Sequence, residues 1–169
     1  RGINLAANSA ETLTMGYILP TCMMNVKVAL TKKIPPTPVR GAGHPQAAFA
    51  MERLLDRVAR ELGLDRAEVR RRNFIPPDAM PYEKQVHARS GLPVVIDTGE
   101  YDIMQQKVLD RAGWAEFTAR QSAARDAGRY LGIGLGNYVK GTGRGPFEAV
   151  TVRIGSSGRI FVACGGSAI

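Results

Sequence analysis

A run of apolar residues at helical spacing, with helix-breaking residues on both sides, constrains the fold more than any other part of the sequence. The residues in question are Ala47, Ala48, Met51, Leu54, Leu55, Val58 and Leu62. Their spacing predicts a helix over 46–62 with one apolar face, and such a face must be buried against another element. Prolines precede this helix and Gly63 ends it.

A second helix is expected immediately afterwards. Asp65 and Glu68 have the spacing of a capping box, and the segment DRAEVRRRNF continues as a helix until Pro76 and Pro77 end it. Acidic and basic residues alternate along this pair of helices. We expect these charges on a solvated helix face or, alternatively, on a surface that docks a partner.

Further elements are predicted on both sides of the two helices. A short helix is expected over 9–17, with Ser9 as its N-cap, and a strand over 22–31. Downstream, the patterns predict helices over 101–114 and 115–127 and strands over 130–139, 147–154 and 159–164. Gly-Ser-Ser-Gly at 155–158 is a hairpin signal. The predicted fold class is therefore α+β, with mixed sheets and packed helices.

The segment 74–97 contains four of the ten prolines and shows almost no periodicity. We therefore expect it to be a linker that crosses between two domains.

The composition is that of a globular protein, with 44% hydrophobic and 22% charged residues. The net charge of +8 raises the possibility of a nucleic-acid partner. Between Glu11 and Glu52 there are four basic residues, Lys27, Lys32, Lys33 and Arg40, and no acidic one. An anionic partner could bind there, and a phosphorylated cofactor would fit as well as a nucleic acid.

No apolar run reaches the roughly 20 residues that a membrane span needs, and the first residues lack the pattern of a signal peptide. The two cysteines lack metal-ligand spacing, so a zinc site or a disulfide framework is not expected. We expect a cytoplasmic protein.

The stretch VRGAGHPQ stands at the start of the first long helix. Gly41 and Gly43 permit positive φ angles and expose peptide N–H groups, and the helix adds the positive end of its dipole. Arg40 adds charge and planar donors. We expect a small anion-receiving surface, although such punctuation before a helix is also common without a ligand. His44 is expected to be a structural hydrogen-bonding residue.

A second group of glycines lies in LGIGLGNYVKGTGRG. The alternating glycines at 132, 134 and 136 would share one face of a strand, either leaving it bare for a ligand or easing packing in a sheet. The glycines around Arg144 are expected to form a functional loop, because such flexible residues are costly to order. Neither glycine group matches a nucleotide-binding motif in its required context.

Four segments together carry a family resemblance. They are ALTKKIPPTPVRGAGHPQAAFAMERLLDRVARELGLDRAEVRRRNFI, MPY, IDTGEYD and GIGLGNYVKGTGRGPFEAVTVRI. In this order they strongly resemble the molybdenum-binding large subunit of the xanthine dehydrogenase and aldehyde oxidase family, and most of all its aerobic carbon monoxide dehydrogenase-like branch. The resemblance covers nearly the whole chain from about Tyr17 onward.

The resemblance implies a molybdenum-dependent oxidoreductase. In such enzymes molybdopterin, often as molybdopterin cytosine dinucleotide, holds a molybdenum centre. This centre hydroxylates a carbon with oxygen from water, while electrons leave through 2Fe-2S clusters and FAD. The implied partners are an FAD-binding medium subunit, an iron–sulfur small subunit, the remainder of the large subunit and a small-molecule substrate. No nucleic acid and no membrane span are expected.

The same resemblance assigns roles to individual residues. It gives Arg40, Gly41 and Gly43 to the cofactor, and Ala42, Gly143 and Arg144 to the substrate pocket. Arg40 is expected to act largely through its main chain, and Gly41 also lines the pocket.

Two positions depart from relatives in an informative way. Copper-containing relatives that oxidise carbon monoxide have a cysteine where this chain has Gly41, so that reaction is not expected. Purine-oxidising relatives have a phenylalanine where this chain has Ala42. The smaller side chain leaves more room, so the expected substrate is an N-heteroaromatic compound or an aldehyde.

The resemblance also implies a domain plan. Residues 1–75 would be the C-terminal part of a first molybdenum-cofactor-binding domain, 76–97 a linker, and 98–169 the N-terminal part of a second such domain. The GQG motif and the glutamate base of the family are expected downstream of Ile169, so no catalytic base is assigned and the segment alone should be inactive. A basic nucleic-acid-binding domain and a noncatalytic split subunit are the alternatives.

Overall fold

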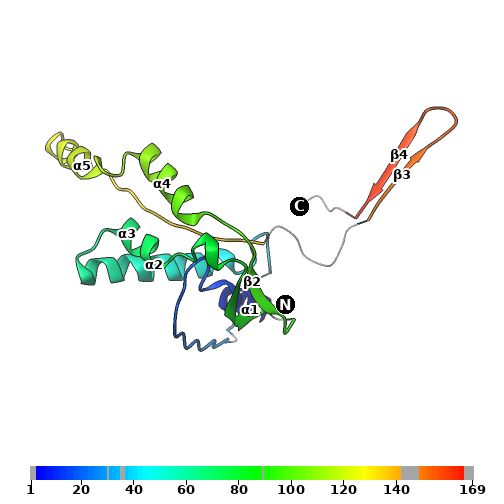
Figure 1. The fold of residues 1–169 in the computed structure, drawn as a ribbon, viewed down its shortest axis with the longest axis horizontal. Helices are drawn as coiled ribbons and strands as arrows, with labels where there is room; N and C mark the ends of the chain where they lie inside the picture. Colours follow the sequence, from blue (N-terminus) through cyan, green and yellow to red (C-terminus); the bar gives the residue numbers. More distant parts are fainter. Residues whose placement is uncertain (1–2, 30, 35–36, 89, 142–148, 166–169) are drawn as a thin grey trace. The chain divides into compact units, whose positions relative to one another are not determined.

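The computed structural model describes residues 3–29, 31–34, 37–88, 90–141 and 149–165. The chain divides into two compact units, Arg1–Val139 and Lys140–Ile169. The elements of the first unit are α1 (Ile3–Thr12), α2 (His44–Leu62), α3 (Arg66–Asn73), a 3₁₀ turn (Pro77–Ala79), β1 (Tyr82–His87), β2 (Pro93–Ile96), α4 (Tyr101–Ala112) and α5 (Phe117–Asp126) (Figure 1). Those of the second unit are β3 (Val150–Ile154) and β4 (Ile160–Cys164).

Helices α2 and α3 confirm the two helices predicted around Gly63. That glycine ends α2 in the left-handed conformation, with a φ of 62°, and its N–H turns back to the last carbonyls of the helix. Asp65 is the N-cap of α3, and its Oδ1 accepts from the N–H groups of Ala67 at 2.8 Å and Glu68 at 3.1 Å. The Glu68 carboxylate pairs with Arg71 and Arg72.

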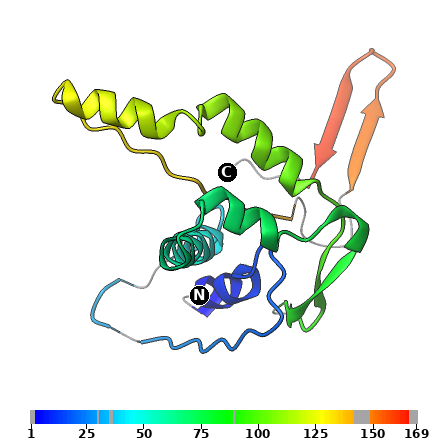
Figure 2. The same ribbon diagram turned by 60° about the vertical axis from the view of Figure 1, so that its left-hand side comes forward.

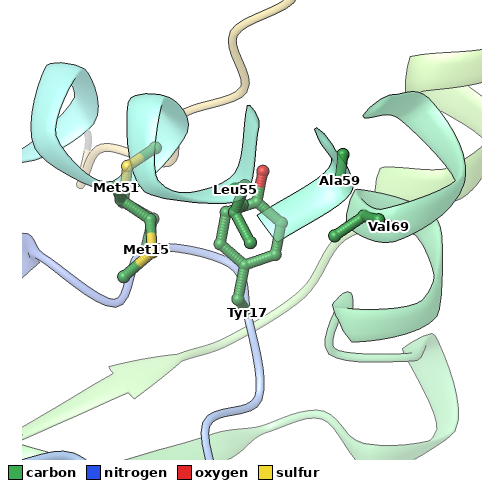
Figure 3. Close-up of a cluster of buried hydrophobic side chains, with 6 residues drawn as sticks. All are labelled: Met15, Tyr17, Met51, Leu55, Ala59 and Val69. Atoms are coloured by element: carbon green, nitrogen blue, oxygen red, sulfur yellow. The ribbon is translucent and has the colours of Figure 1, made fainter. Parts of the chain in front are cut away.

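The core forms where the apolar face of α2 meets α3 and the segment after α1. Its buried side chains are Met15, Tyr17, Met51, Leu55, Ala59 and Val69. Figure 3 shows Met51 and Leu55 projecting from α2 toward Met15 and Tyr17. The Tyr17 ring also stacks on Phe74, with 5.4 Å between the ring centroids. The predicted apolar face was too wide, because Leu54 and Leu62 are more than half exposed.

Three predictions in the first unit were wrong at the level of local structure. The first helix is α1, so Ser9 lies inside a helix and is not an N-cap. The segments 22–29 and 130–139 are extended but belong to no sheet. Both have strand-like sequences, but in the described residues no neighbouring strand pairs with them.

The segment 74–97, expected to be an irregular linker, contains a short antiparallel hairpin. Strand β1 pairs with β2 through Tyr82 opposite Ile96 and Glu83 opposite Val95. Lys84 of β1 is buried, and its Nζ donates to the carbonyl of Tyr17 at 2.6 Å. The hairpin is thereby tied to the core of the first unit, while the domain boundary at 76–97 stays a prediction.

Helices α4 and α5 confirm the two helices predicted over 101–127. Figure 2 shows them following each other on the other side of the extended segment from α2 and α3. Gln105 joins the two sides, because its Nε2 donates to the carbonyl of Ala67 on α3 at 3.1 Å.

The second unit is a hairpin of β3 and β4 in regular register, from Val150 opposite Cys164 to Ile154 opposite Ile160. The predicted Gly-Ser-Ser-Gly turn joins them and closes with the N–H of Gly155 bonded to the carbonyl of Arg159. None of the helices in the described ranges is long and apolar enough to cross a bilayer.

The buried ammonium of Lys84 makes a pH-dependent contribution to stability. Burial lowers the pKa of Lys84 to about 8, against 10.5 in the unfolded chain. Between these values the unfolded chain holds the proton and the folded chain releases it, so the free energy of unfolding rises with pH. We expect a rise of about 1 to 2 kcal/mol from pH 8 to pH 10, above which the raised pKa of Tyr17 acts in the opposite direction.

The measurement is the urea midpoint at pH 8, 9 and 10 for the wild type and for Lys84→Met, which keeps the apolar stem without the titrating group. The free energy of unfolding of Lys84→Met should not show the rise between pH 8 and pH 10. Equal pH dependence in the two proteins would show that Lys84 is not the group responsible.

Candidate functional site

The loop before α2 has the unusual backbone that its sequence predicts. Gly41 and Gly43 have φ angles of 100° and 102°, and Ala42 between them also has a positive φ, of 29°. Two short hydrogen bonds fold the loop on itself, from the N–H of Ala42 to the carbonyl of Val39 at 2.9 Å and from the N–H of His44 to the carbonyl of Gly41 at 2.8 Å. Left-handed conformations at both glycines are thus confirmed.

Helix α1 supports this loop from one side. Asn8 Nδ2 donates to the carbonyl of Ala42 at 2.7 Å, and Ser9 Oγ donates to the carbonyl of Gly43 at 3.0 Å. The approach is so close that a Cβ at Gly43 would lie 2.5 Å from the carbonyl oxygen of Leu5. Only glycine fits there. Sequence reasoning missed both α1 residues, because they lie 34 positions before their partners.

The other side of the loop is open and offers donors. Arg40 is exposed, and a Cβ at Gly41 would meet only the side chain of Pro45. Within the part of the chain that the structure describes, no acceptor is bonded to the guanidinium of Arg40 or to the N–H groups of Gly41 and Gly43. These donors and the start of α2 are suited to an anionic group such as a phosphate.

The basic residues upstream of the loop do not gather into a folded surface. Lys27, Lys32 and Lys33 are all exposed, and each lies outside any helix or strand. Their contribution to an anion at the loop is therefore limited to long-range attraction, which salt screens.

The alternating glycines at 132, 134 and 136 do lie on one side of the extended segment 130–139. A Cβ at any of them would meet nothing within 4 Å. The residues between them turn toward the helices: the carbonyls of Ile133 and Leu135 accept from Arg66 and Arg70. Of the predicted pocket residues, Gly143 and Arg144 lie outside the described residues.

A buried polar network holds this extended segment against the helices. Arg70 is 0% exposed, and its Nε donates to Glu52 at 2.7 Å while its Nη2 reaches Asp56 at 2.9 Å. Glu52 also accepts from the Tyr17 hydroxyl at 2.6 Å and from the N–H of Asn137 at 3.0 Å. Burial and the adjacent Glu52 carboxylate raise the pKa of Tyr17, so its hydroxyl stays protonated.

This network corrects the expectation that the charges of the two helices all lie on a solvated face. Glu52 and Arg70 are buried, whereas Arg71 and Arg72 are exposed and pair with the half-buried Glu68. Glu52 stands one helical turn after Ala48 and one turn before Leu55, on the apolar face of α2. This position was the sequence signal that Glu52 is buried. Its partner on the next helix could not be identified from spacing alone.

No group of three histidine, cysteine, aspartate or glutamate side chains gathers among the described residues in the way a protein-ligated metal needs. Metal ligands from the described part of the chain are therefore not assigned.

The chain is similar to several known proteins. Residues 2–74 match the model of the molybdopterin cofactor-binding domain. The chain is similar to subunit gamma of the 6-hydroxypseudooxynicotine dehydrogenase complex of Paenarthrobacter nicotinovorans, with 30% identity over 90% of this chain and 19% of that protein. It is also similar to the carbon monoxide dehydrogenase large chain of Hydrogenophaga pseudoflava, with 28% identity over 88% of this chain and 20% of that protein.

Among solved structures, quinoline 2-oxidoreductase from Pseudomonas putida 86 matches with a TM-score of 0.73 and 28% identity, over 98% of this chain and 22% of that one. The chain thus spans about a fifth of the length of the relatives it matches. The agreement supports the predicted α+β fold of a molybdopterin-binding domain.

Removing one member of the buried pair should destabilise the protein strongly. Arg70→Met leaves Glu52 as an uncompensated buried charge, and we expect a loss of about 3 to 5 kcal/mol in the free energy of unfolding. Arg71→Met removes an exposed arginine from the same helix, and its loss should stay below about 1 kcal/mol.

Urea titration of both variants measures the difference. The double variant Glu52→Leu with Arg70→Met should recover part of the loss, because no unpaired charge then remains buried. Equal midpoints for Arg70→Met and Arg71→Met would show that the network does not hold the helices together.

Proposed function

Because the chain belongs to the family of molybdenum-binding large subunits of xanthine dehydrogenase and aldehyde oxidase type, we propose that the loop 40–43 binds the molybdopterin cofactor. One observation carries this proposal. The loop offers the main-chain N–H groups of Gly41 and Gly43, next to the exposed Arg40, at the start of α2. Molybdopterin carries a phosphate, and these donors fit an anion.

Within the loop, some residues are proposed to contact the cofactor and one to contact the substrate. Arg40, Gly41 and Gly43 would hold the cofactor, while the methyl group of Ala42 would border the substrate pocket. When bound, the cofactor supplies the oxidation that allows a carbon atom to take up oxygen from water. The chain itself would hold and orient the cofactor, and it would shape the space around the reacting carbon.

The proposed reaction is oxidative hydroxylation of an N-heteroaromatic compound or an aldehyde. Ala42 supports it, because a methyl group leaves room for a ring that a larger side chain would exclude. The names of two relatives support the heteroaromatic class, since one acts on 6-hydroxypseudooxynicotine and another on quinoline. Gly41 cannot supply a thiolate to copper, which argues against carbon monoxide oxidation.

The proposal extends to the assembly. Relatives are named as one subunit or large chain of a larger enzyme, and we propose an FAD-binding medium subunit and an iron–sulfur small subunit as partners. Molybdopterin cytosine dinucleotide is the proposed cofactor form, and the cytoplasm the proposed location. Gly143 and Arg144 stay proposed substrate-side residues.

The test is the molybdenum content of the complete enzyme, purified with its partner chains. The wild type should contain molybdenum and molybdopterin, and Arg40→Ala should lower molybdenum per protein or turnover by about tenfold, the effect of one charge-assisted hydrogen bond. Arg57→Ala, at an exposed arginine on α2, is the matched control and should change neither.

An enzyme without molybdenum would refute the proposed function. Unchanged molybdenum content and turnover in Arg40→Ala would refute a contact between the Arg40 guanidinium and the cofactor, and would leave only the main-chain contacts of the loop.

A further inference from the structure

The backbone of the loop before α2 requires support from outside the loop. Ala42 has a Cβ and yet a positive φ, between two glycines that also have positive φ angles. A residue in such a conformation costs about 1 to 3 kcal/mol and persists only where its surroundings fix it. The contacts that fix this loop should therefore matter for whatever the loop binds.

Helix α1 provides those contacts through two adjacent side chains. Asn8 is 8% exposed, and its amide reaches the carbonyl of Ala42. A buried amide donor has little access to water, so losing this acceptor would leave it unsatisfied. The single hydroxyl proton of Ser9 is shared between two carbonyls, that of Gly43 at 3.0 Å and that of Leu5 in its own helix at 2.8 Å.

The bond from Asn8 sets the direction of a donor on the opposite side of the loop. The carbonyl of Ala42 and the N–H of Gly43 belong to one planar peptide unit, and in a trans peptide they point in opposite directions. Because Asn8 draws the carbonyl toward α1, the N–H of Gly43 must point away from α1. On that side it has no acceptor within the described residues.

The bond from Ser9 acts on the following peptide unit together with α2 itself. The carbonyl of Gly43 accepts from Ser9 Oγ at 3.0 Å and from the N–H of Ala47 at 3.1 Å, and the N–H of His44 on the opposite side of that unit donates to the carbonyl of Gly41 at 2.8 Å. The peptide unit after Ala42 is thus oriented from α1, and the unit after Gly43 from α1 and α2 together. The missing Cβ of Gly43 allows the close approach of α1.

We propose that Asn8 and Ser9 are positioning residues for the molybdopterin site: from α1, they orient the peptide units of Ala42 and Gly43 so that the Gly43 N–H faces the cofactor. This inference rests on the proposed function of the loop. Neither side chain would touch the cofactor itself. Asn8 contributes more than Ser9 to the orientation of the loop, because its hydrogen bond is the shorter one and its amide is buried.

The test compares variants in the complete enzyme. Asn8→Asp keeps the size of the side chain but removes the donor, and Asn8→Ala removes the whole amide. Ser9→Ala removes only the hydroxyl. Thr12→Ala is the control, because the Thr12 hydroxyl bonds to the carbonyl of Asn8 within α1 at 2.8 Å and does not reach the loop.

Three quantities are measured for each protein: molybdenum and molybdopterin per chain, the thermal midpoint, and hydrogen exchange of the peptide containing Gly43 before the cofactor is inserted. Asn8→Ala and Asn8→Asp should lower the molybdenum content by about tenfold and Ser9→Ala by about threefold. They should also speed exchange at the loop, whereas Thr12→Ala should change neither quantity.

The outcomes separate this inference from the proposed function. Absence of molybdenum from the wild type would refute the proposed function itself. Full molybdenum content in Asn8→Asp and Ser9→Ala, beside a loaded wild type, would overturn the positioning role and leave the proposed function intact. The role would also be overturned if both Asn8 variants lost molybdenum only in proportion to a lower thermal midpoint, with unchanged exchange at the loop.

Discussion

The ion pair between Glu52 and Arg70 is the interaction on which the first unit depends. It joins α2 to α3 at a place that water does not reach, with Arg70 0% exposed. A buried charge pair stabilises a fold only where its remaining donors and acceptors are also satisfied. Here Tyr17, Asp56 and the backbone of the extended segment complete the set. The pair therefore fixes the consecutive helices α2 and α3 and, with them, two segments that are far away in the sequence, the one with Tyr17 and the extended one with Asn137.

The ion pair affects the loop 40–43 through α2. The loop 40–43 is continuous with α2, so whatever fixes α2 also fixes the direction in which the helix presents its first turn. Glu52 anchors the middle of α2, and Asn8 and Ser9 hold the loop itself. The chain thus combines a rigid helix with a loop in a conformation that is unfavourable on its own. Main-chain donors held in this way need little rearrangement when an anion binds.

Local signals predicted those parts of the structure that depend on neighbouring residues. Gly63 and Asp65 marked the junction between α2 and α3, because a left-handed C-terminus and an N-cap are properties of a few consecutive residues. Ser9 was misassigned for the same reason: the N-cap rule considers the next turn, whereas its hydroxyl bonds to Gly43. Burial of Glu52 and Arg70 depends on contacts between two helices, and no spacing rule identifies such a pair. The glycine-rich segment looked like a strand, but helix side chains bond to its carbonyls instead.

The central claim is the proposal that the loop before α2 binds molybdopterin through its main-chain N–H groups, and that α1 orients these groups. An experimental structure of the complete enzyme with its cofactor tests it most directly, through the distance from the Gly43 nitrogen to the nearest cofactor oxygen, nitrogen or sulfur atom. The account predicts hydrogen-bond contact, about 3 Å for an oxygen or nitrogen acceptor, with the carbonyl of Ala42 still bonded to Asn8. A cofactor that contacts none of the residues 40–43, or a loop whose Gly43 N–H points toward α1, would contradict it.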